Sequence, residues 1–293
     1  MKALELFAGA GGLALGISQA GFGHLGVVEW DKDACDSMRE NARRGHKHLK
    51  TWPILQEDVK RIGFASFGED IDLLAGGVPC QPLSMGGKHR GQTDDRNLFP
   101  EMVRAVRETR PKAVLVENVK GLLRQSFAAY FEYITLYLAH PDVAQKPSED
   151  WHQHLRRLEQ HHTSGYKSDL EYNVTFRLLN AADYGVPQKR ERVFIVAFRS
   201  DLQSEWSFPE ATHSAQALSH SKWLSKEYWE RHKVPMRSRS QLQERERLRL
   251  TKADLFSVNR KPWVTVRDAL MDLPEPLVRG HRDWPNHVLM PGA

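Results

Sequence analysis

The fold is decided by Ala3-Leu4-Glu5-Leu6-Phe7-Ala8-Gly9-Ala10-Gly11-Gly12, close to the amino terminus. The stretch opens with an apolar run typical of a buried strand and continues into closely spaced glycines. Beyond it, Leu13, Ile17 and Ala20 recur at helical spacing, and Gly21 follows as a helix stop. The stretch therefore predicts a strand, a glycine-rich turn and a helix in direct succession.

The same alternation continues outward over the first two hundred residues. The predicted strands are residues 3–7, 25–30, 71–75, 113–117, 172–179 and 192–198. Residues 97–109 place Phe99, Val103 and Val106 on one stripe of a helix and tolerate Pro100 in its first turn. Strands that alternate with helices are typical of an α/β fold with a mostly parallel sheet.

Two regions interrupt the alternation. Residues 140–170 are rich in His, Lys, Glu and Ser, and we expect an inserted surface helix or a mobile excursion there. From about residue 199 the strand periodicity is lost and basic clusters such as Arg231-His232-Lys233 follow. We therefore expect a boundary near Ser200, between a large domain at 1–200 and a small second domain at 201–293.

Bulk composition indicates a soluble enzyme of a reducing compartment. The chain has 293 residues with 40% hydrophobic content, enough for a substantial core. Two cysteines exclude a disulfide scaffold, and their neighbours predict no metal site. No leader and no membrane-spanning run is recognisable, so we expect a cytoplasmic protein with no membrane partner. The formal charge of +5 is compatible with a nucleic-acid partner but does not establish one.

The glycine-rich turn indicates a nucleotide-like ligand. Its glycines let the backbone approach a ligand, and the helix that follows offers free N–H groups. Gly9, Gly11 and Ala14 also satisfy the G-x-G-x-x-G/A dinucleotide fingerprint, and Glu29 lies about twenty residues further on. An acid at that position binds ribose hydroxyls in either case. The turn therefore predicts an adenosine-containing cofactor and leaves its identity open, NAD included.

A cysteine stands in the run Gly76-Gly77-Val78-Pro79-Cys80-Gln81-Pro82-Leu83-Ser84, directly after a predicted strand. Prolines on both sides stiffen the loop and hold the thiol away from the core, which favours a nucleophile over a packing cysteine. Glu117 closes the strand at 113–117. Ligands bind at the carboxyl ends of the strands in open α/β sheets, so we expect Cys80, Glu117 and the glycine-rich turn to meet at one edge.

A basic run, Tyr184-Gly185-Val186-Pro187-Gln188-Lys189-Arg190-Glu191-Arg192, leads into the last predicted strand. Residues two apart on a strand face the same way, so we expect Gln188, Arg190 and Arg192 to project from one side. Two aligned guanidinium groups suit a phosphate or a nucleobase carbonyl. A ladder of surface ion pairs is the alternative interpretation.

Taken in this order, the blocks resemble those of the cytosine carbon-5 DNA methyltransferases. The family's F-x-G-x-G-G block matches residues 7–12, P-C-Q matches 79–81, E-N-V matches 117–119 and Q-x-R-x-R matches 188–192. The resemblance extends over about residues 1–200. It implies a Rossmann-like, S-adenosylmethionine-dependent methyltransferase fold with helices on both faces of a twisted sheet. It also implies S-adenosylmethionine rather than NAD, with S-adenosylhomocysteine as the product.

The resemblance also assigns residues to roles. It implies a catalytic set of Cys80, Glu117, Arg190 and Arg192, and substrate contacts from Gln81, Ser84 and Gln188, with no metal. The implied cofactor-binding residues are Phe7, Gly9, Gly11, Gly12, Leu13, Glu29, Trp30, Asp58, Val59, Gly77, Pro79 and Leu98. Among them, Asp58 is expected to meet the adenine amino group and Leu98 to border the cofactor.

The implied reaction is methylation of carbon 5 of cytosine in double-stranded DNA. A thiolate adds at carbon 6, because carbon 5 is too poor a nucleophile unaided. Cys80 is expected to supply the thiolate, Glu117 to stabilise charge at ring nitrogen 3 and Arg192 to hold the base oxygen. A stacked base cannot present carbon 6 to a thiol, so the target must be flipped out of the duplex.

The resemblance weakens toward the carboxyl end. Residues 263–276 are similar to the segment that leads into the family's target-recognition domain, and the final blocks are expected to be missing, truncated or carried by another chain. We expect a bacterial-type restriction-modification enzyme with a cognate restriction enzyme encoded nearby but not necessarily bound. The alternatives are a transfer-RNA cytosine methyltransferase and an incomplete binding subunit that needs a carboxyl-terminal partner chain.

Overall fold

The computed structural model describes residues 1–68, 70–79, 97–251, 259–284 and 287–290. These residues form two compact units. The first comprises Met1–Leu179 and Glu191–Phe208, and the second comprises Asn180–Arg190 and Pro209–Ala293. No helix among the described residues is long and apolar enough to cross a membrane.

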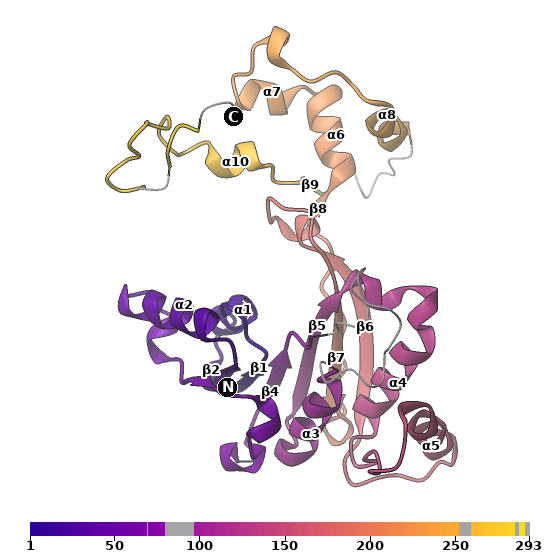
Figure 1. The fold of residues 1–293 in the computed structure, drawn as a ribbon. Coiled ribbons are helices and arrows are strands. Elements are labelled where there is room, and N and C mark those ends of the chain that lie inside the picture. Colours follow the sequence, from indigo (N-terminus) through magenta and orange to yellow (C-terminus); the bar gives the residue numbers. More distant parts are fainter. Residues whose placement is uncertain (69, 80–96, 252–258, 285–286, 291–293) are drawn as a thin grey trace. The chain divides into compact units, whose positions relative to one another are not determined.

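The first unit is built on a seven-stranded sheet in the order β3-β2-β1-β4-β5-β7-β6 (Figure 1). The strands are β1 (Lys2–Leu6), β2 (Gly23–Glu29), β3 (Ile54–Gln56), β4 (Leu73–Gly76), β5 (Ala113–Val119), β6 (Tyr172–Asn180) and β7 (Glu191–Arg199). Strands β1 to β5 pair in parallel, and β7 runs antiparallel to β5. The predicted mostly parallel α/β sheet is confirmed, whereas the short β3 was missed.

Helices cover both faces of this sheet because its central strands carry apolar side chains on both faces. The helices of the first unit are α1 (Gly12–Gln19), α2 (Lys32–Arg43), α3 (Phe99–Thr109), α4 (Ala128–Ala139) and α5 (Trp151–Thr163). Ala3 and Ala75 pack with α1 on one face. Leu4 and Leu74 pack with α3 and α4 on the other. Side chains at successive strand positions point to opposite faces, so a single strand serves both layers.

The segment at 140–170 forms a packed surface helix, one of the two outcomes expected for it. Asp150 and Gln153 make a capping box at the start of α5, which satisfies backbone N–H groups there. Leu155 and Leu158 are buried and join the main core. The polar composition that marked this segment therefore belongs to the outward face of α5.

The expected boundary near Ser200 differs from the division seen in the structure. The first unit continues to Phe208, which is 7% exposed and lies with its ring 4.7 Å from that of Trp206. The guanidinium of Arg177 lies 5.2 Å from the Phe208 ring. These aromatic contacts keep residues 200–208 with the sheet although strand periodicity has ended.

The second unit gathers two separate stretches of chain. Its elements are β8 (His213–Ser214), α6 (Ala215–Trp223), α7 (Glu227–Arg231), α8 (Glu244–Thr251), β9 (Lys261–Pro262) and α10 (Val266–Leu270). Asp183 connects the stretches, because its carboxylate accepts a 2.8 Å hydrogen bond from Trp263 Nε1 and its carbonyl accepts one from Thr212 N at 3.0 Å. These bonds explain why residues 180–190 belong to this unit.

Candidate active site

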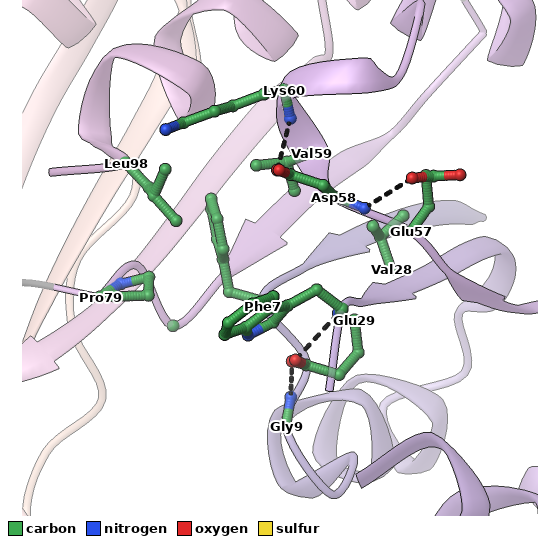
Figure 2. Close-up of a pocket in the computed structure, with 12 residues that line it drawn as sticks. Phe7, Gly9, Val28, Glu29, Glu57, Asp58, Val59, Lys60, Pro79 and Leu98 are labelled. Carbon is green, nitrogen blue, oxygen red and sulfur yellow. Dashed lines mark hydrogen bonds between the residues drawn. The ribbon is translucent and has the colours of Figure 1, made fainter. Parts of the chain in front are cut away.

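A cavity of about 400 Å³ lies at the carboxyl ends of the parallel strands (Figure 2). Strands β1, β2, β3 and β4 end here, and α3 begins here. The lining residues are Phe7, Gly9, Val28, Glu29, Trp30, Glu57, Asp58, Val59, Lys60, Gly77, Pro79 and Leu98. In Figure 2, Gly9 and Glu29 lie on one side, Asp58 and Lys60 on another, and Pro79 and Leu98 face them. Nine of these twelve residues are in the cofactor-binding set that the resemblance implies.

The glycine-rich turn after β1 has an unusual backbone. Phe7, Gly9 and Gly11 all have positive φ angles, of 57°, 55° and 83°. Glycine adopts this region without steric cost, whereas Phe7 is strained there. Such strain persists only where the surroundings fix it, and it clusters at ligand sites. Gly9 and Phe7 consequently turn along the edge of the cavity.

Gly11 has a packing role rather than a lining role. A Cβ atom at Gly11 would lie 2.7 Å from Trp52 Cζ3 and 3.0 Å from Met38 Sδ, so no larger residue fits. Its N–H donates to Ala8 O at 2.9 Å. Gly12 begins α1 and Leu13 packs against the cluster of Ala3 and Ile17. Gly11, Gly12 and Leu13 therefore shape the turn but do not line the cavity.

The buried carboxylate of Glu29 organises the cavity floor. Its two oxygens accept backbone N–H groups from Gly9 at 2.7 Å and from Trp30 and Asp31 at 2.9 Å each. A carboxylate offers about four lone-pair sites, and these three bonds leave room for about one more. Glu29 is 7% exposed. It is thus a fixed acceptor that can take one hydroxyl of a ligand.

A second acidic group follows β3. Asp58 caps a short 3-10 helix by accepting Lys60 N at 3.0 Å, and Asp58 N donates to Glu57 Oε1 at 3.0 Å. From behind, Arg104 Nη2 donates to Val59 O at 2.8 Å. Two acids on a loop braced by a guanidinium group suit polar parts of a ligand, while the apolar residues opposite suit a flat ring.

Glu117 and Arg192 form an ion pair at the same edge of the sheet. Arg192 lies opposite Val119 in the antiparallel pairing of β5 and β7, which places it on the same face as Glu117. The distance from Arg192 Nε to Glu117 Oε1 is 2.8 Å, and each side chain is 24% exposed. A Cβ atom at Gly77 would lie 3.8 Å from Glu117 Oε2. Gly77 therefore connects the ion pair to the cavity that it lines.

Asn118 was missed in the sequence, although it stands in the E-N-V block. It is 4% exposed, and its Nδ2 donates to Val78 O at 3.1 Å. Val78 precedes Pro79 and Cys80 in the chain, so Asn118 fixes the backbone that leads to the predicted nucleophile. Cys80, Gln81 and Ser84 themselves lie outside the described residues.

The expected common face of Gln188, Arg190 and Arg192 is wrong in one respect. Strand β7 begins at Glu191, so the strand alternation does not extend back to Gln188 and Arg190. These two residues lie in the loop at 180–190, where Arg190 N donates to Asn180 Oδ1 at 3.2 Å. Pro187 lacks a backbone N–H, which weakens strand pairing in this stretch.

Three further lining residues were missed. Val28 stands one position before Glu29, and Glu57 and Lys60 flank Asp58. Glu57 and Lys60 could have been predicted from β3, the three-residue strand that precedes them and whose Gln56 pairs with Glu29 of β2. A run this short does not show an alternating pattern that can be told from a loop.

Comparison with known proteins decides the family. A family model described as C-5 cytosine-specific DNA methylase matches residues 1–141 and 156–264. The chain belongs to this family. S-adenosylmethionine, the methyl donor of these enzymes, is therefore the cofactor that the cavity must accommodate.

The chain is similar to several type II methyltransferases, including M.NgoMIV, M.AquIA and M.PspPI. M.NgoMIV of Neisseria gonorrhoeae is 39% identical over 71% of this chain and 54% of its own length. M.AquIA of a Picosynechococcus strain is 32% identical over 93% of this chain and 89% of its own length. M.PspPI of a Psychrobacter strain is 36% identical over 74% of this chain and 44% of its own length. The chain thus spans about half the length of M.NgoMIV and M.PspPI and most of that of M.AquIA.

The cavity residues fit this cofactor. Fixed carboxylate oxygens of Glu29 suit ribose hydroxyls, and the three acids Glu29, Glu57 and Asp58 favour a positively charged sulfonium. Val59, Pro79 and Leu98 supply an apolar lining for an adenine ring.

Proposed function

We propose that this chain methylates carbon 5 of cytosine in duplex DNA as part of a type II restriction-modification system. The observation that carries the proposal is the Glu117–Arg192 ion pair beside Gly77, because it puts an acid and a guanidinium next to a cavity suited to the methyl donor. The target cytosine would then lie beside this pair.

In the proposed reaction the Cys80 thiolate adds its electron pair to carbon 6 of the cytosine. Glu117, in its protonated form, gives a proton or hydrogen bond to ring nitrogen 3 as electrons move toward carbon 5, and Arg192 holds both Glu117 and the base oxygen. The cofactor, held by the cavity residues, would supply an electrophilic methyl group to carbon 5 and leave as S-adenosylhomocysteine. A solvent base then takes the carbon-5 proton, and the electron pair of the broken C–H bond expels the Cys80 thiolate. Arg190 and Arg192 favour the thiolate through their positive charge.

The cofactor set in this proposal has two parts. The residues proposed to touch the cofactor are Phe7, Gly9, Glu29, Trp30, Asp58, Val59, Gly77, Pro79 and Leu98, all of which line the cavity. Asn118 and Gly11 act as positioning residues through the loop and the turn. Gln81, Ser84, Gln188 and Arg190 are proposed to contact the DNA once the base is flipped out, at a cost of a few kcal/mol.

The deciding experiment traps the covalent adduct. Duplex DNA with 5-fluorocytosine in place of cytosine, incubated with S-adenosylmethionine, should form a protein–DNA species resistant to denaturation, because fluorine cannot leave as the proton does. Cys80→Ser should abolish it and Cys35→Ser, which changes the buried cysteine of α2, should not. An adduct formed by the Cys80→Ser variant would refute the role of the thiol.

Two further measurements separate the alternatives. Methyl incorporation should exceed background with duplex DNA and not with transfer RNA, since the reverse would assign the chain to RNA. Calorimetric titration should show binding of S-adenosylhomocysteine and not of NAD. If the cofactor binds but no substrate is methylated, the chain is a binding subunit, and addition of a chain carrying the missing blocks should then produce activity.

A further inference from the structure

A cluster of two histidines and a glutamate lies away from the cavity, where α4, α5 and the start of β6 come together. His140 follows α4, His161 stands in the last turn of α5, and Glu171 directly precedes β6. One possible ligand atom from each of the three lies within 4.8 Å of the other two. All three residues belong to the first unit, and none takes part in the proposed reaction.

His140 points an unsatisfied nitrogen into this cluster. It is 7% exposed, and its Nδ1 has no hydrogen-bond partner among the described residues. The nearest carboxylate oxygen, Glu171 Oε1, is 3.9 Å away, beyond hydrogen-bond range. Leaving a buried polar atom without a partner is costly, which requires an explanation at this position.

The other ring nitrogen of His140 makes the kind of hydrogen bond that metal-bound histidines make. His140 Nε2 lies 2.8 Å from His162 Nδ1, a distance that lets Nε2–H donate and leaves the lone pair on Nδ1. A histidine that binds a metal through one nitrogen usually donates the other N–H to a neighbouring acceptor.

The remaining two groups are positioned by one loop. Ser168 Oγ lies 2.9 Å from His161 Nε2, and Ser168 N donates to Glu171 Oε1 at 2.9 Å. The loop thereby holds an imidazole and a carboxylate near the orphaned nitrogen of His140. Two imidazoles and one carboxylate form a donor set that zinc accepts, with water as a fourth ligand.

We propose that His140, His161 and Glu171 bind a zinc ion that joins the ends of α4 and α5 to the start of β6. Ligands of a tetrahedral zinc with bonds of about 2.1 Å lie about 3.4 Å apart, so binding closes the present spacing by roughly 1 Å. His140 precedes residues 142–155, which the family model leaves unmatched, and His161 and Glu171 follow them. Zinc bound here would therefore tie together the chain on the two sides of this segment.

The test uses the 293-residue chain without a histidine tag, stripped of metal and then equilibrated with zinc. Elemental analysis should find about one zinc ion per chain, and the metal should raise Tm by several degrees. Glu171→Gln and His161→Gln, which change partly exposed side chains, should each lower the zinc affinity at least tenfold and remove most of the Tm gain. His152→Gln, on the same helix but outside the cluster, is the matched control and should behave like the wild type.

Cobalt gives a readout that depends on the ligands themselves. The cobalt-loaded wild type should show the visible absorption of a tetrahedral nitrogen and oxygen site, and Glu171→Gln should alter it. The proposal is overturned if the wild type binds no stoichiometric zinc. It is equally overturned if both variants, shown to be folded by circular dichroism, retain wild-type zinc affinity. Neither result bears on methyl transfer, so this test stands apart from the adduct experiment.

Discussion

At the scale of single residues, the candidate site has two kinds of residue. Some line the cavity, where they can contact a ligand, and others hold the lining residues in place. Glu29 and Asp58 line the cavity, but each carboxylate also accepts a backbone N–H, from Gly9 of the glycine-rich turn and from Lys60 respectively. Gly11 and Asn118 act from outside the cavity through packing and a hydrogen bond. Mutations of the cavity-lining residues and mutations of Gly11 or Asn118 should therefore have different measurable effects.

Gly11→Ala should destabilise the fold by about 1–3 kcal/mol, because the new Cβ would press on Trp52 in a backbone region unfavourable to alanine. The free energy of unfolding from urea titration measures this. Gly12→Ala is the matched control, since nothing lies within 4 Å of a Cβ there, and it should change stability by less than about 0.5 kcal/mol. Equal losses in the two variants would contradict the packing role of Gly11.

Glu117→Gln should lower the rate of methyl transfer by about 10²–10⁴-fold, because the amide cannot give up a proton to the base. The affinity for S-adenosylhomocysteine should stay within about twofold of the wild type. Glu191→Gln is the control, as Glu191 pairs instead with Lys120 at 2.9 Å. A large loss of cofactor affinity in Glu117→Gln would place the residue in the cofactor site instead of beside the base.

At the scale of elements, local interactions account for the segment at 140–170. The start of α5 is fixed by its capping box and by a bidentate ion pair, in which Arg157 Nε and Nη2 each lie 2.7 Å from an oxygen of Glu149. Arg157 Nη2 also donates to Ala144 O. These bonds turn a polar, unmatched stretch into an ordered helix that covers the core.

The Glu149–Arg157 pair predicts a pH dependence of stability. The hydrogen bonds from Arg157 lower the pKa of Glu149 to about 2 from its ordinary 4.5. A carboxylate with a lowered pKa in the folded state stabilises the protein above pH 4.5, and this stabilisation is lost as pH falls toward 2. Glu149→Gln should therefore be less stable than the wild type at pH 7, and the difference should shrink between pH 4.5 and 3.

Urea unfolding of both proteins across this pH range is the measurement. Glu159→Gln, in α5, serves as the control and should show a nearly constant difference. A Glu149→Gln deficit that persists unchanged at pH 3 would show that the side chain acts through packing and not through its charge.

At the scale of the whole molecule, the chain passes between its two units more than once. The stretch at 180–190 leaves the sheet after β6, joins the second unit through Asp183, and returns as β7. It carries Gln188 and Arg190, which we propose contact DNA. The second unit is therefore expected to govern DNA binding through this stretch while the first unit holds the cofactor.

Trp263→Phe should test this division of labour. It removes the hydrogen bond to Asp183 and exchanges the indole ring, which lies 5.2 Å from Lys189 Nζ, for a smaller aromatic ring. Loss of one hydrogen bond corresponds to about 1 kcal/mol, so DNA affinity should fall several-fold, while S-adenosylhomocysteine affinity should not change. Fluorescence anisotropy with duplex DNA and calorimetry with the cofactor product measure the two, and Trp284→Phe is the control. A parallel loss of both affinities would contradict the division.

The sequence by itself determined the α/β fold and, to within a few residues, six of the seven strands of the large sheet, while its resemblance to the family implied most of the cavity lining. It could do so because buried strands, glycine turns and strand-end acids leave local patterns in the chain. Tertiary structure alone decided that Gly11 packs against Trp52, that Asn118 holds Val78 and that Glu117 pairs with Arg192. It also decided the His140, His161 and Glu171 cluster and the place of residues 180–190. These depend on contacts between residues far apart in the chain, which no local pattern records.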